Sequence, residues 1–561
     1  MGVETELKLI VAPEALARVP RLAAVRERKQ GRARTQRLVT RYFDTPDLAL
    51  HRAGMVLRLR HTEDGWIQAV KSGGVSVGGL QSRGEWEVAV PGAAPVLEAI
   101  KATPAFKVLG GARGFRTLGQ VFETDFTRVL IPLRFDDGST AELCVDSGEV
   151  RSGGRFSPIH EVELELKQGN AACLFDMADA LSKVVPLRIG HGSKAELGHA
   201  LARRVIAHGK PLRAARPDVR QDMAWDEAFR CVVGACLSHL QANESGMLVG
   251  RDPEFLHQMR IALRRMRSSF AVFRKHLDSA AVAPIEAVLR DMGNRLGAAR
   301  DWDVLVTESL LPFSAAFPDV GAVSAMMRKA RRVRGVQDRA ARDLVASPDY
   351  VRGMLMVGRL LASPLAEPPA SAAPTDLDRP AGHDRQAGLQ AFAAHILQRR
   401  HRRLRKLGAS LRRAAQGPAM SSIELHRLRI LAKKLRYAAE FFEPLFHGNR
   451  ARRYIRSLAR LQDALGGLND CANGVRLIGE LTPASGRFTL QQRDGELAAV
   501  RFEGWLAAHR SRYLGQFSGR WQTFEEQPRF WKKELPSVDE RGAQEAAAGA
   551  TEVDQSGDER H

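Results

Sequence analysis

The spacing of apolar residues changes once along the 561-residue chain, near residue 205. Before this point, short runs alternate polar and apolar side chains and end in Gly-rich or Asp-rich turns, a period of two that predicts β-strands. After it, apolar residues recur every three or four positions, which predicts long helices. The pattern therefore predicts an α+β multidomain protein, with an antiparallel β domain over residues 1–204 and an all-α domain over residues 222–525.

Two stretches of the helical half lack this periodicity. Residues 363–386 are rich in Pro, Ala and Asp, as in a connection between helical units. Residues 536–561 are polar, rich in Gly and Ala, and offer no apolar pattern for a core. We expect a flexible insert at the first stretch and a disordered tail at the second.

The β half consists of alternating runs that predict strands. They span residues 3–9, 37–45, 55–60, 66–71, 83–90, 122–132, 141–146 and 159–167. The first run places Glu4, Glu6 and Lys8 on one face and apolar residues on the other, because successive side chains of a strand point to opposite faces. Charge on this strand therefore points one way.

The same alternation of charge returns in other runs. The last run carries Glu161, Glu163, Glu165 and Lys167 at every second position, and Arg58 and Arg60 have the same spacing. Such alternation is also common on solvated strand faces. Its recurrence favours a closed sheet whose interior is lined by both signs of charge. Carboxylates there would hold hard cations, and arginines and lysines would hold an anion.

The chain has a formal net charge of +21, which indicates a polyanionic partner such as nucleic acid, an anionic membrane or a phosphate polymer. Its five cysteines are scattered and form no Cys-x-x-Cys pair, which argues against a disulfide framework and a zinc ribbon. No basic and apolar leader precedes Val3, and the most apolar long stretch, 310–327, is interrupted by prolines. We expect a soluble, cytoplasmic protein with no membrane partner.

The helical half contains an internal repeat. Residues 257–267 align with 426–436, and residues 296–301 align with 465–470. Both alignments have an offset of 169 residues (426 minus 257, and 465 minus 296). Two related helical halves follow from this shared offset.

Each copy of the repeat carries a basic stripe headed by a histidine. Positions i, i+3, i+7 and i+10 fall within an arc of about 80° on a helix. The stripes are His257, Arg260, Arg264 and Arg267 in the first copy, and His426, Arg429, Lys433 and Arg436 in the second. Apolar stripes oppose them at Met259, Leu263, Met266 and Phe270, and at Leu428, Ala432, Leu435 and Ala439. A single basic stripe usually faces solvent, but two related stripes favour an anion bound in a groove between them.

Other chemistries lack support in the sequence. It contains no Gly-x-x-x-x-Gly-Lys-Ser/Thr, no His-Glu-x-x-His and no Gly-x-Ser-x-Gly motif. The basic stripes have no interleaved aromatic residues on the same face, which disfavours base stacking and hence nucleic acid. We expect single histidines such as His160, His191 and His276 to be packing or surface residues.

The charged β motifs together resemble the CYTH family, the triphosphate tunnel metalloenzymes, over residues 1–204. The motifs are Glu4-x-Glu6-x-Lys8, Tyr42-Phe-Asp-Thr, Arg58-x-Arg60, Lys71, Thr124-Asp-Phe-Thr-Arg128, Glu163-x-Glu165 and Ser193-Lys194. That family folds as an eight-stranded antiparallel tunnel and includes inorganic triphosphatases, thiamine triphosphatases and class IV adenylate cyclases. One departure is Glu196, since the family often carries another arginine in that neighbourhood.

The resemblance implies roles for these residues. Metal ligands would be Glu4, Glu6, Asp146, Glu163 and Glu165, whose oxygens suit Mg²⁺ or Mn²⁺. Substrate phosphates would be bound by Lys8, Arg58, Arg60, Lys71, Arg128 and Lys194. Lys8 and Tyr42 would act as catalytic residues that orient or activate a water. We expect no covalent intermediate, because no nucleophile with an adjacent base is present among these residues.

The duplicated helices resemble the CHAD family, helical domains associated with inorganic polyphosphate, and the whole chain resembles bacterial CYTH-CHAD triphosphatases. The resemblance implies metal-dependent hydrolysis of inorganic triphosphate by the tunnel. The helical domain would bind polyphosphate or place the enzyme at polyphosphate granules. The alternatives are a class IV type adenylate cyclase, a thiamine triphosphatase and a non-catalytic polyphosphate-binding scaffold.

Overall fold

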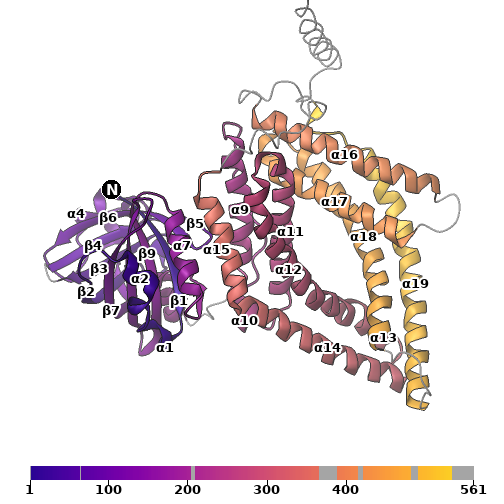
Figure 1. Ribbon diagram of the computed structural model, residues 1–561, viewed down its shortest axis with the longest axis horizontal. Coiled ribbons are helices and arrows are strands. Elements are labelled where there is room, and N and C mark those ends of the chain that lie inside the picture. The colour runs from indigo at the N-terminus through magenta and orange to yellow at the C-terminus, as the bar shows by residue number, and fades with distance from the viewer. Residues whose placement is uncertain are drawn as a thin grey trace, which may run out of the picture.

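The structure is a computed structural model that describes residues 2–62, 65–203, 209–365, 388–414, 421–481 and 490–532. Strands occupy the first part of the chain and helices the second, as the change of period near residue 205 predicts (Figure 1). Most of the predicted insert at 363–386, and all of the predicted tail at 536–561, lie outside the described residues.

Eight antiparallel strands close into a barrel. In spatial order they are β1 (Gly2–Val11), β9 (Arg155–Gln168), β8 (Thr140–Ser152), β7 (Gly119–Arg134), β2 (Arg34–Asp44), β3 (Val56–Thr62), β4 (Gly65–Lys71) and β6 (Leu80–Val90). The barrel closes because β6 pairs with β1 through residues Gly2 to Leu7. The predicted eight-stranded antiparallel fold is confirmed. Two three-residue strands that the pattern missed, β5 (Val75–Val77) and β10 (Leu187–Ile189), pair with β6 and β1.

The alternation along the strands separates an apolar outer face from a charged interior. Leu7, Leu9 and Leu164 face outward and are fully buried beneath α1 (Pro13–Leu16), α2 (Ala23–Arg28) and α7 (Ala172–Ser182). On the opposite side, short helices cover β3 and β4: α3 (Ala49–Arg52), α4 (Leu97–Lys101), α5 (Pro104–Val108) and α6 (Ala112–Phe115). The helix α8 (Lys194–Arg203) packs against β7, β8 and β9.

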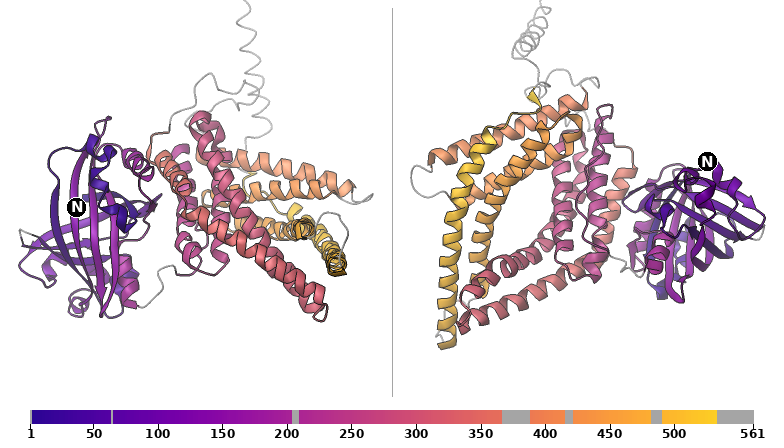
Figure 2. Two further views of the ribbon diagram at one scale, coloured as in Figure 1. Left: turned by 60° about the horizontal axis from the view of Figure 1, so that its bottom comes forward. Right: turned by 180° about the vertical axis from the view of Figure 1, so that it is seen from behind.

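The helical half is built mostly from long helices that pack in pairs. They are α9 (Trp225–Gln241), α10 (Glu244–Val249), α11 (Glu254–Phe273), α12 (Ser279–Val304), α13 (Leu311–Ala316), α14 (Gly321–Ala346), α15 (Pro348–Ala362), α16 (Leu389–Ala414), α17 (Ser422–Phe442), α18 (Arg450–Leu481) and α19 (Leu490–Glu525). The pairs α12 with α14, α16 with α17 and α18 with α19 form the arms of a frame (Figures 1 and 2). The two motif helices, α11 and α17, pack against each other.

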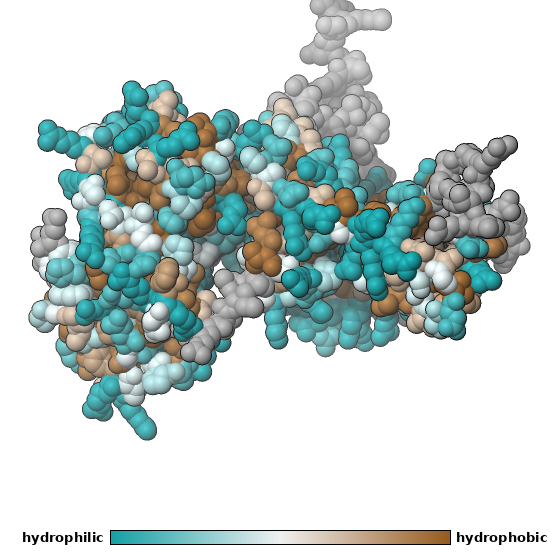
Figure 3. Space-filling view, turned by 90° about the horizontal axis from the view of Figure 1, so that it is seen from below, coloured by the Kyte–Doolittle hydropathy of each residue, from teal (hydrophilic) through white to brown (hydrophobic). Residues whose placement is uncertain are grey.

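The barrel and the helices share a hydrophobic core. Helix α7 packs along α15, and the two lie side by side in Figure 1. The contact is close at Gly358, where an added Cβ would lie 2.2 Å from the Phe175 ring. Hydrophilic side chains cover much of the face seen from below, as the high charge of the chain requires (Figure 3). Among the described helices, none combines the length and apolarity needed to cross a bilayer.

Candidate active site in the barrel and a basic cluster between helices

The register of three neighbouring strands brings acidic residues together inside the barrel. Lys8 on β1 lies opposite Glu163 on β9, and Glu6 lies opposite Glu165. On the other side of β9, Glu161 lies opposite Asp146 on β8. Directly opposed residues of an antiparallel pair point to the same face, so these side chains all project into the interior.

Three cations neutralise the buried acidic group of Asp146, Glu161 and Glu163. Lys194 contacts all three carboxylates, at 2.8, 2.6 and 2.8 Å respectively. Lys8 lies 3.0 Å from Glu163 and 3.3 Å from Glu161. Arg128 donates two hydrogen bonds to Asp146, at 2.8 and 2.6 Å, and a third to Glu163 at 2.5 Å. Asp146 is fully buried, and these cations are its charged partners.

A second group of ion pairs lines the wall formed by β1, β3, β4 and β6. Lys71 lies 2.5 Å from Glu4 and 3.3 Å from Glu85. Arg58 contacts Glu85 at 2.8 Å and Glu87 at 3.4 Å. Cations and carboxylates therefore alternate around this wall as they do around the acidic group.

Tyr42 and Arg60 complete the interior near these groups. Tyr42 on β2 lies opposite Arg58, and Arg60 lies opposite Thr40, whose hydroxyl accepts a hydrogen bond from the Arg60 Nε at 3.3 Å. The Tyr42 ring stacks on Phe122 with centroids 4.3 Å apart. The structure thus places the predicted Tyr42 beside a predicted phosphate-binding arginine, with its ring held by packing.

Burial shifts the protonation of several interior groups. Burial, together with the nearby Glu163, raises the pKa of Glu6 to about 7. Burial and the adjacent Arg58 lower the pKa of Arg60 to about 10. Burial alone would raise the pKa of Glu163, but Lys194, Lys8 and Arg128 outweigh it and hold the pKa well below its usual value.

The acidic group has the ligands expected of a site for a hard cation. One oxygen from each of Asp146, Glu161 and Glu163 lies within 4.8 Å of the others. An all-oxygen set fits Mg²⁺ or Mn²⁺ better than a softer metal. The predicted ligands Asp146 and Glu163 belong to this group, whereas Glu4, Glu6 and Glu165 lie outside it along the same interior face. Their role as metal ligands stays a prediction.

Several interior residues were missing from the predicted site. Glu161 continues the Glu163-x-Glu165 alternation and could have been included on that signal. Glu85 and Glu87 also alternate, but only the pairing of β6 with β1 and β4 shows that they face Lys71 and Arg58. Glu196, the departure from the family pattern, caps α8: its carboxylate accepts from the Ser193 amide at 2.8 Å, and its amide donates to the Ser193 hydroxyl at 3.1 Å.

The basic stripes of α11 and α17 meet in part. Arg260 and Arg264 face Arg429 and Lys433, and we call these four residues the basic cluster. The other stripe members have different partners. His426 hydrogen-bonds Asn469 at 2.9 Å, Arg436 pairs with Glu440 on its own helix at 3.3 Å, and Arg267 lies beside α12. The opposing apolar stripes are buried, as predicted.

The repeat extends to acidic neighbours of the basic cluster. Arg260 lies 3.9 Å from Asp301, and Asp470 is the residue equivalent to Asp301 in the second half. Burial, with Arg429 and Arg264 nearby, lowers the pKa of Lys433 to about 6. Burial and Arg300 lower the pKa of His257 to about 4. An unperturbed histidine would gain a proton just below pH 7, but His257 would not, because its ring is buried among cations.

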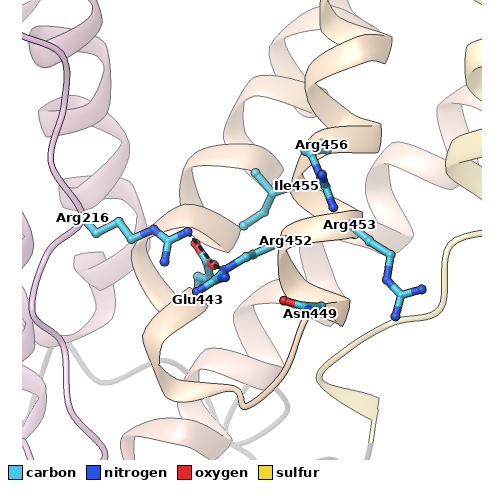
Figure 4. Close-up of a pocket in the computed structure, with 7 residues that line it drawn as sticks. All are labelled: Arg216, Glu443, Asn449, Arg452, Arg453, Ile455 and Arg456. Carbon is cyan, nitrogen blue, oxygen red and sulfur yellow. Dashed lines mark hydrogen bonds and ion pairs between the residues drawn. The ribbon is translucent and has the colours of Figure 1, made fainter.

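A separate arginine-rich cavity lies where α18 begins (Figure 4). Glu443 at its base pairs with Arg216 at 2.9 Å and with Arg452 at 3.1 Å. Arg216 belongs to the segment that leads from the barrel to α9, and Gln221 of that segment donates to the Leu445 carbonyl at 3.0 Å. These contacts fasten the connecting segment to the second helical half.

Family models match both parts of the chain. Residues 2–198 match the CYTH domain and residues 231–477 match the CHAD domain. The chain is a CYTH domain followed by a CHAD domain. The barrel with its charged interior is the CYTH part, and the paired motif helices lie in the CHAD part.

Similar proteins include an inorganic triphosphatase of Haemophilus influenzae, 33% identical over 205 residues. The match covers 35% of this chain and 54% of that protein, so the chain spans about half the length of this relative. The CHAD domain crystal structure from the plant Ricinus communis is 28% identical, covers 57% of this chain and 98% of that chain, and has a TM-score of 0.45. PptA from Streptomyces chartreusis is 16% identical, covers 54% and 100%, and has a TM-score of 0.40. At such TM-scores neither structure is a guide to the arrangement of this chain.

Proposed function

We propose that the CYTH barrel hydrolyses inorganic triphosphate in a reaction that depends on Mg²⁺ or Mn²⁺. The observation that carries the proposal is the closed interior in which Lys8, Arg128 and Lys194 converge on three buried carboxylates. A triphosphate has several negative charges, so its site must provide both fixed cations and divalent metal. The named activity of the Haemophilus influenzae relative supports this choice of substrate.

The interior residues have complementary roles in this proposal. Lys8, Arg58, Arg60, Lys71, Arg128 and Lys194 bind the phosphate oxygens, and Lys8 with Tyr42 orients the attacking water. Asp146 and Glu163, with Glu4, Glu6 and Glu165 along the same face, would hold the metal. When bound, such a metal would polarise the phosphoryl group and neutralise its developing charge.

A competition assay tests the reaction. The full chain is given tripolyphosphate, ATP and thiamine triphosphate at equal concentration with Mg²⁺. Phosphate, pyrophosphate, ADP, thiamine diphosphate and cyclic AMP are quantified, so that each product is assigned to its substrate. We expect phosphate and pyrophosphate from tripolyphosphate to dominate. Cyclic AMP from ATP would identify a cyclase, preference for thiamine triphosphate would identify a thiamine triphosphatase, and no turnover of any substrate would leave a binding scaffold.

We also propose that the helical domain binds polyphosphate at the basic cluster. Arg264, Arg429 and Lys433 are brought together, and among the described residues no carboxylate forms an ion pair with them, although Asp470 and Asp301 lie nearby. A linear phosphate polymer supplies negative charge at every unit. Binding should weaken steeply with added salt as counterions are released. Competition between long-chain polyphosphate and nucleic acid of equal charge, at fixed ionic strength, tests the preference. Equal competition by nucleic acid would contradict it.

A further inference from the structure

One loop of the barrel packs on Lys8 and leads directly into Lys194, two of the proposed phosphate-binding lysines. It runs from Gly190 after β10 to Ser193, and Lys194 follows as the first residue of α8. The Gly190 amide donates to the Lys8 carbonyl at 2.8 Å. A Cβ at Gly190 would lie 2.7 Å from Lys8 Cγ, so the loop backbone rests directly on the lysine stem. The position of this loop, together with the ion pairs of the barrel, therefore affects where both ammonium groups lie.

The helical domain holds the same loop through a hydrogen-bonded chain. The His191 Nε2 lies 2.9 Å from a carboxylate oxygen of Glu244, the first residue of α10. The other oxygen of Glu244 accepts a hydrogen bond from the buried Tyr350 hydroxyl of α15 at 2.5 Å. Because a carboxylate only accepts, His191 donates from Nε2. His191 is thus an interdomain contact, which the sequence had not predicted.

Another polar contact between the domains lies away from this loop. Arg359 on α15 donates to Asp176 on α7 at the edge of the shared apolar core, and both side chains are about half exposed. Asp176 belongs to a helix on the outside of the barrel, whereas His191 is three residues from Lys194. The two contacts join the same domains, but only the His191 contact leads into the barrel interior.

We propose that Glu244 of the helical domain is a positioning residue for Lys194 and Lys8, acting through His191. The proposal rests on the proposed function in one respect, that these lysines bind triphosphate. It makes the affinity of the CYTH site depend on the CHAD domain, because one side-chain anchor of the loop, Glu244, lies outside the barrel. The barrel supplies the others, Gln81 to the His191 carbonyl at 3.5 Å and Glu196 to the Ser193 amide at 2.8 Å. Changes at Glu244 should alter substrate affinity more than turnover. They displace Lys194, which binds phosphate, whereas the Lys8 ammonium that orients the water is also held by Glu161 and Glu163.

The test uses the full chain and two ligands. Binding of imidotriphosphate, whose P–N–P bridges resist hydrolysis, is measured by calorimetry with Mg²⁺, and KM and kcat are measured with tripolyphosphate. We expect Glu244→Ala and His191→Ala each to raise Kd and KM about tenfold, the effect of losing one charge-assisted hydrogen bond. The double variant should be no weaker than either single variant, because both remove the same contact.

The matched control is Arg359→Gln, which removes an interdomain ion pair away from the loop and should leave Kd unchanged. Thermal unfolding shows whether each variant is folded. If both Glu244→Ala and His191→Ala are folded and have an unchanged Kd, the proposal is overturned. An equal rise for Arg359→Gln would also overturn it, since general domain docking would then be the cause. If the wild type binds imidotriphosphate but does not cleave tripolyphosphate, hydrolysis is refuted and the Kd comparison still decides the role of Glu244.

Discussion

The barrel interior and the basic cluster both gather lysines and arginines, but they compensate the charge differently. In the barrel, Lys8, Arg128 and Lys194 each contact two or three carboxylates within 3.3 Å. In the basic cluster, the described residues form one ion pair, between Arg260 and Asp301 at 3.9 Å. One site is neutralised internally, and the other retains repulsion between like charges.

The difference indicates how each site would bind an anion. A triphosphate entering the barrel must compete with carboxylates for the same cations, and a divalent metal that engages those carboxylates would favour the exchange. A polyphosphate bound at the basic cluster, as proposed, would relieve repulsion directly and would need no metal. Burial is the main cause that lowers the pKa of Lys433 to about 6 and that of Arg260 to about 10. Neighbouring cations lower both further, while Asp301 partly offsets the shift at Arg260.

The largest effect should follow from removing a carboxylate of the barrel. Glu4→Gln or Glu165→Gln should lower kcat for tripolyphosphate at least about 100-fold at saturating Mg²⁺. Loss of a residue that only hydrogen-bonds to a metal ligand costs about 10–100-fold, and loss of a ligand itself should cost more. The fold should survive, because neither side chain belongs to an apolar core. The control is Glu123→Gln, which loses an ion pair to Arg41 outside the interior. Normal turnover in either test variant would remove that residue from the metal site.

Reversing charge in the basic cluster should have the next largest effect. Arg264→Glu combined with Lys433→Glu should weaken polyphosphate binding about 100-fold at moderate salt, because both substitutions place negative charge in the same proposed anion site. The matched control is Arg402→Glu with Lys406→Glu, the same residue types on the exposed face of α16. Chelation of divalent metal should abolish hydrolysis but leave this binding intact. Similar losses in the two double variants would mean that binding follows net charge alone.

The pH dependence of polyphosphate binding should be smaller and should depend on Lys433. Its pKa of about 6 would rise beside a bound polyanion, so binding at pH 7 takes up a proton. Affinity should therefore increase as pH falls from 8 to 6, by at most about tenfold per pH unit, and level off below 6. Calorimetry in buffers of different ionisation enthalpy measures the uptake. Lys433→Arg, charged throughout, should flatten the profile; a profile unchanged in this variant would assign the proton to another group.

The strand pattern predicted the barrel interior well because a period of two assigns each side chain to a face. It predicted that Glu4, Glu6 and Lys8 share a surface with Glu163 and Glu165, and the register confirms it. It could not reveal which cation meets which carboxylate, because Lys71 meets Glu85 only through the pairing of β4 with β6. Cross-strand register is a property of the closed sheet and not of any one segment.

The helical stripes were predicted less completely. Their arc follows from helix geometry, but neighbouring helices decide which members meet, and Arg267 and Arg436 take other partners. The low pKa of His257 likewise depends on its burial and on Arg300 from α12. Neither can be predicted from the sequence of α11 alone. The contact of His191 with Glu244 was not predicted because Glu244 lies in the other domain.

The smallest effect on turnover should follow from separating the two domains. The interior ion pairs described above are formed within residues 2–203, and only the His191 contact needs the helical domain. A fragment ending near residue 204 should therefore retain most of the kcat of the full chain. Its KM should rise about as much as in Glu244→Ala, since the loop before Lys194 loses the same anchor. Its stability should fall, because Phe175 loses the cover of α15. Steady-state kinetics below the unfolding temperature of the fragment measures both constants. A folded fragment without activity would show that the helical domain completes the catalytic site instead of adjusting its affinity.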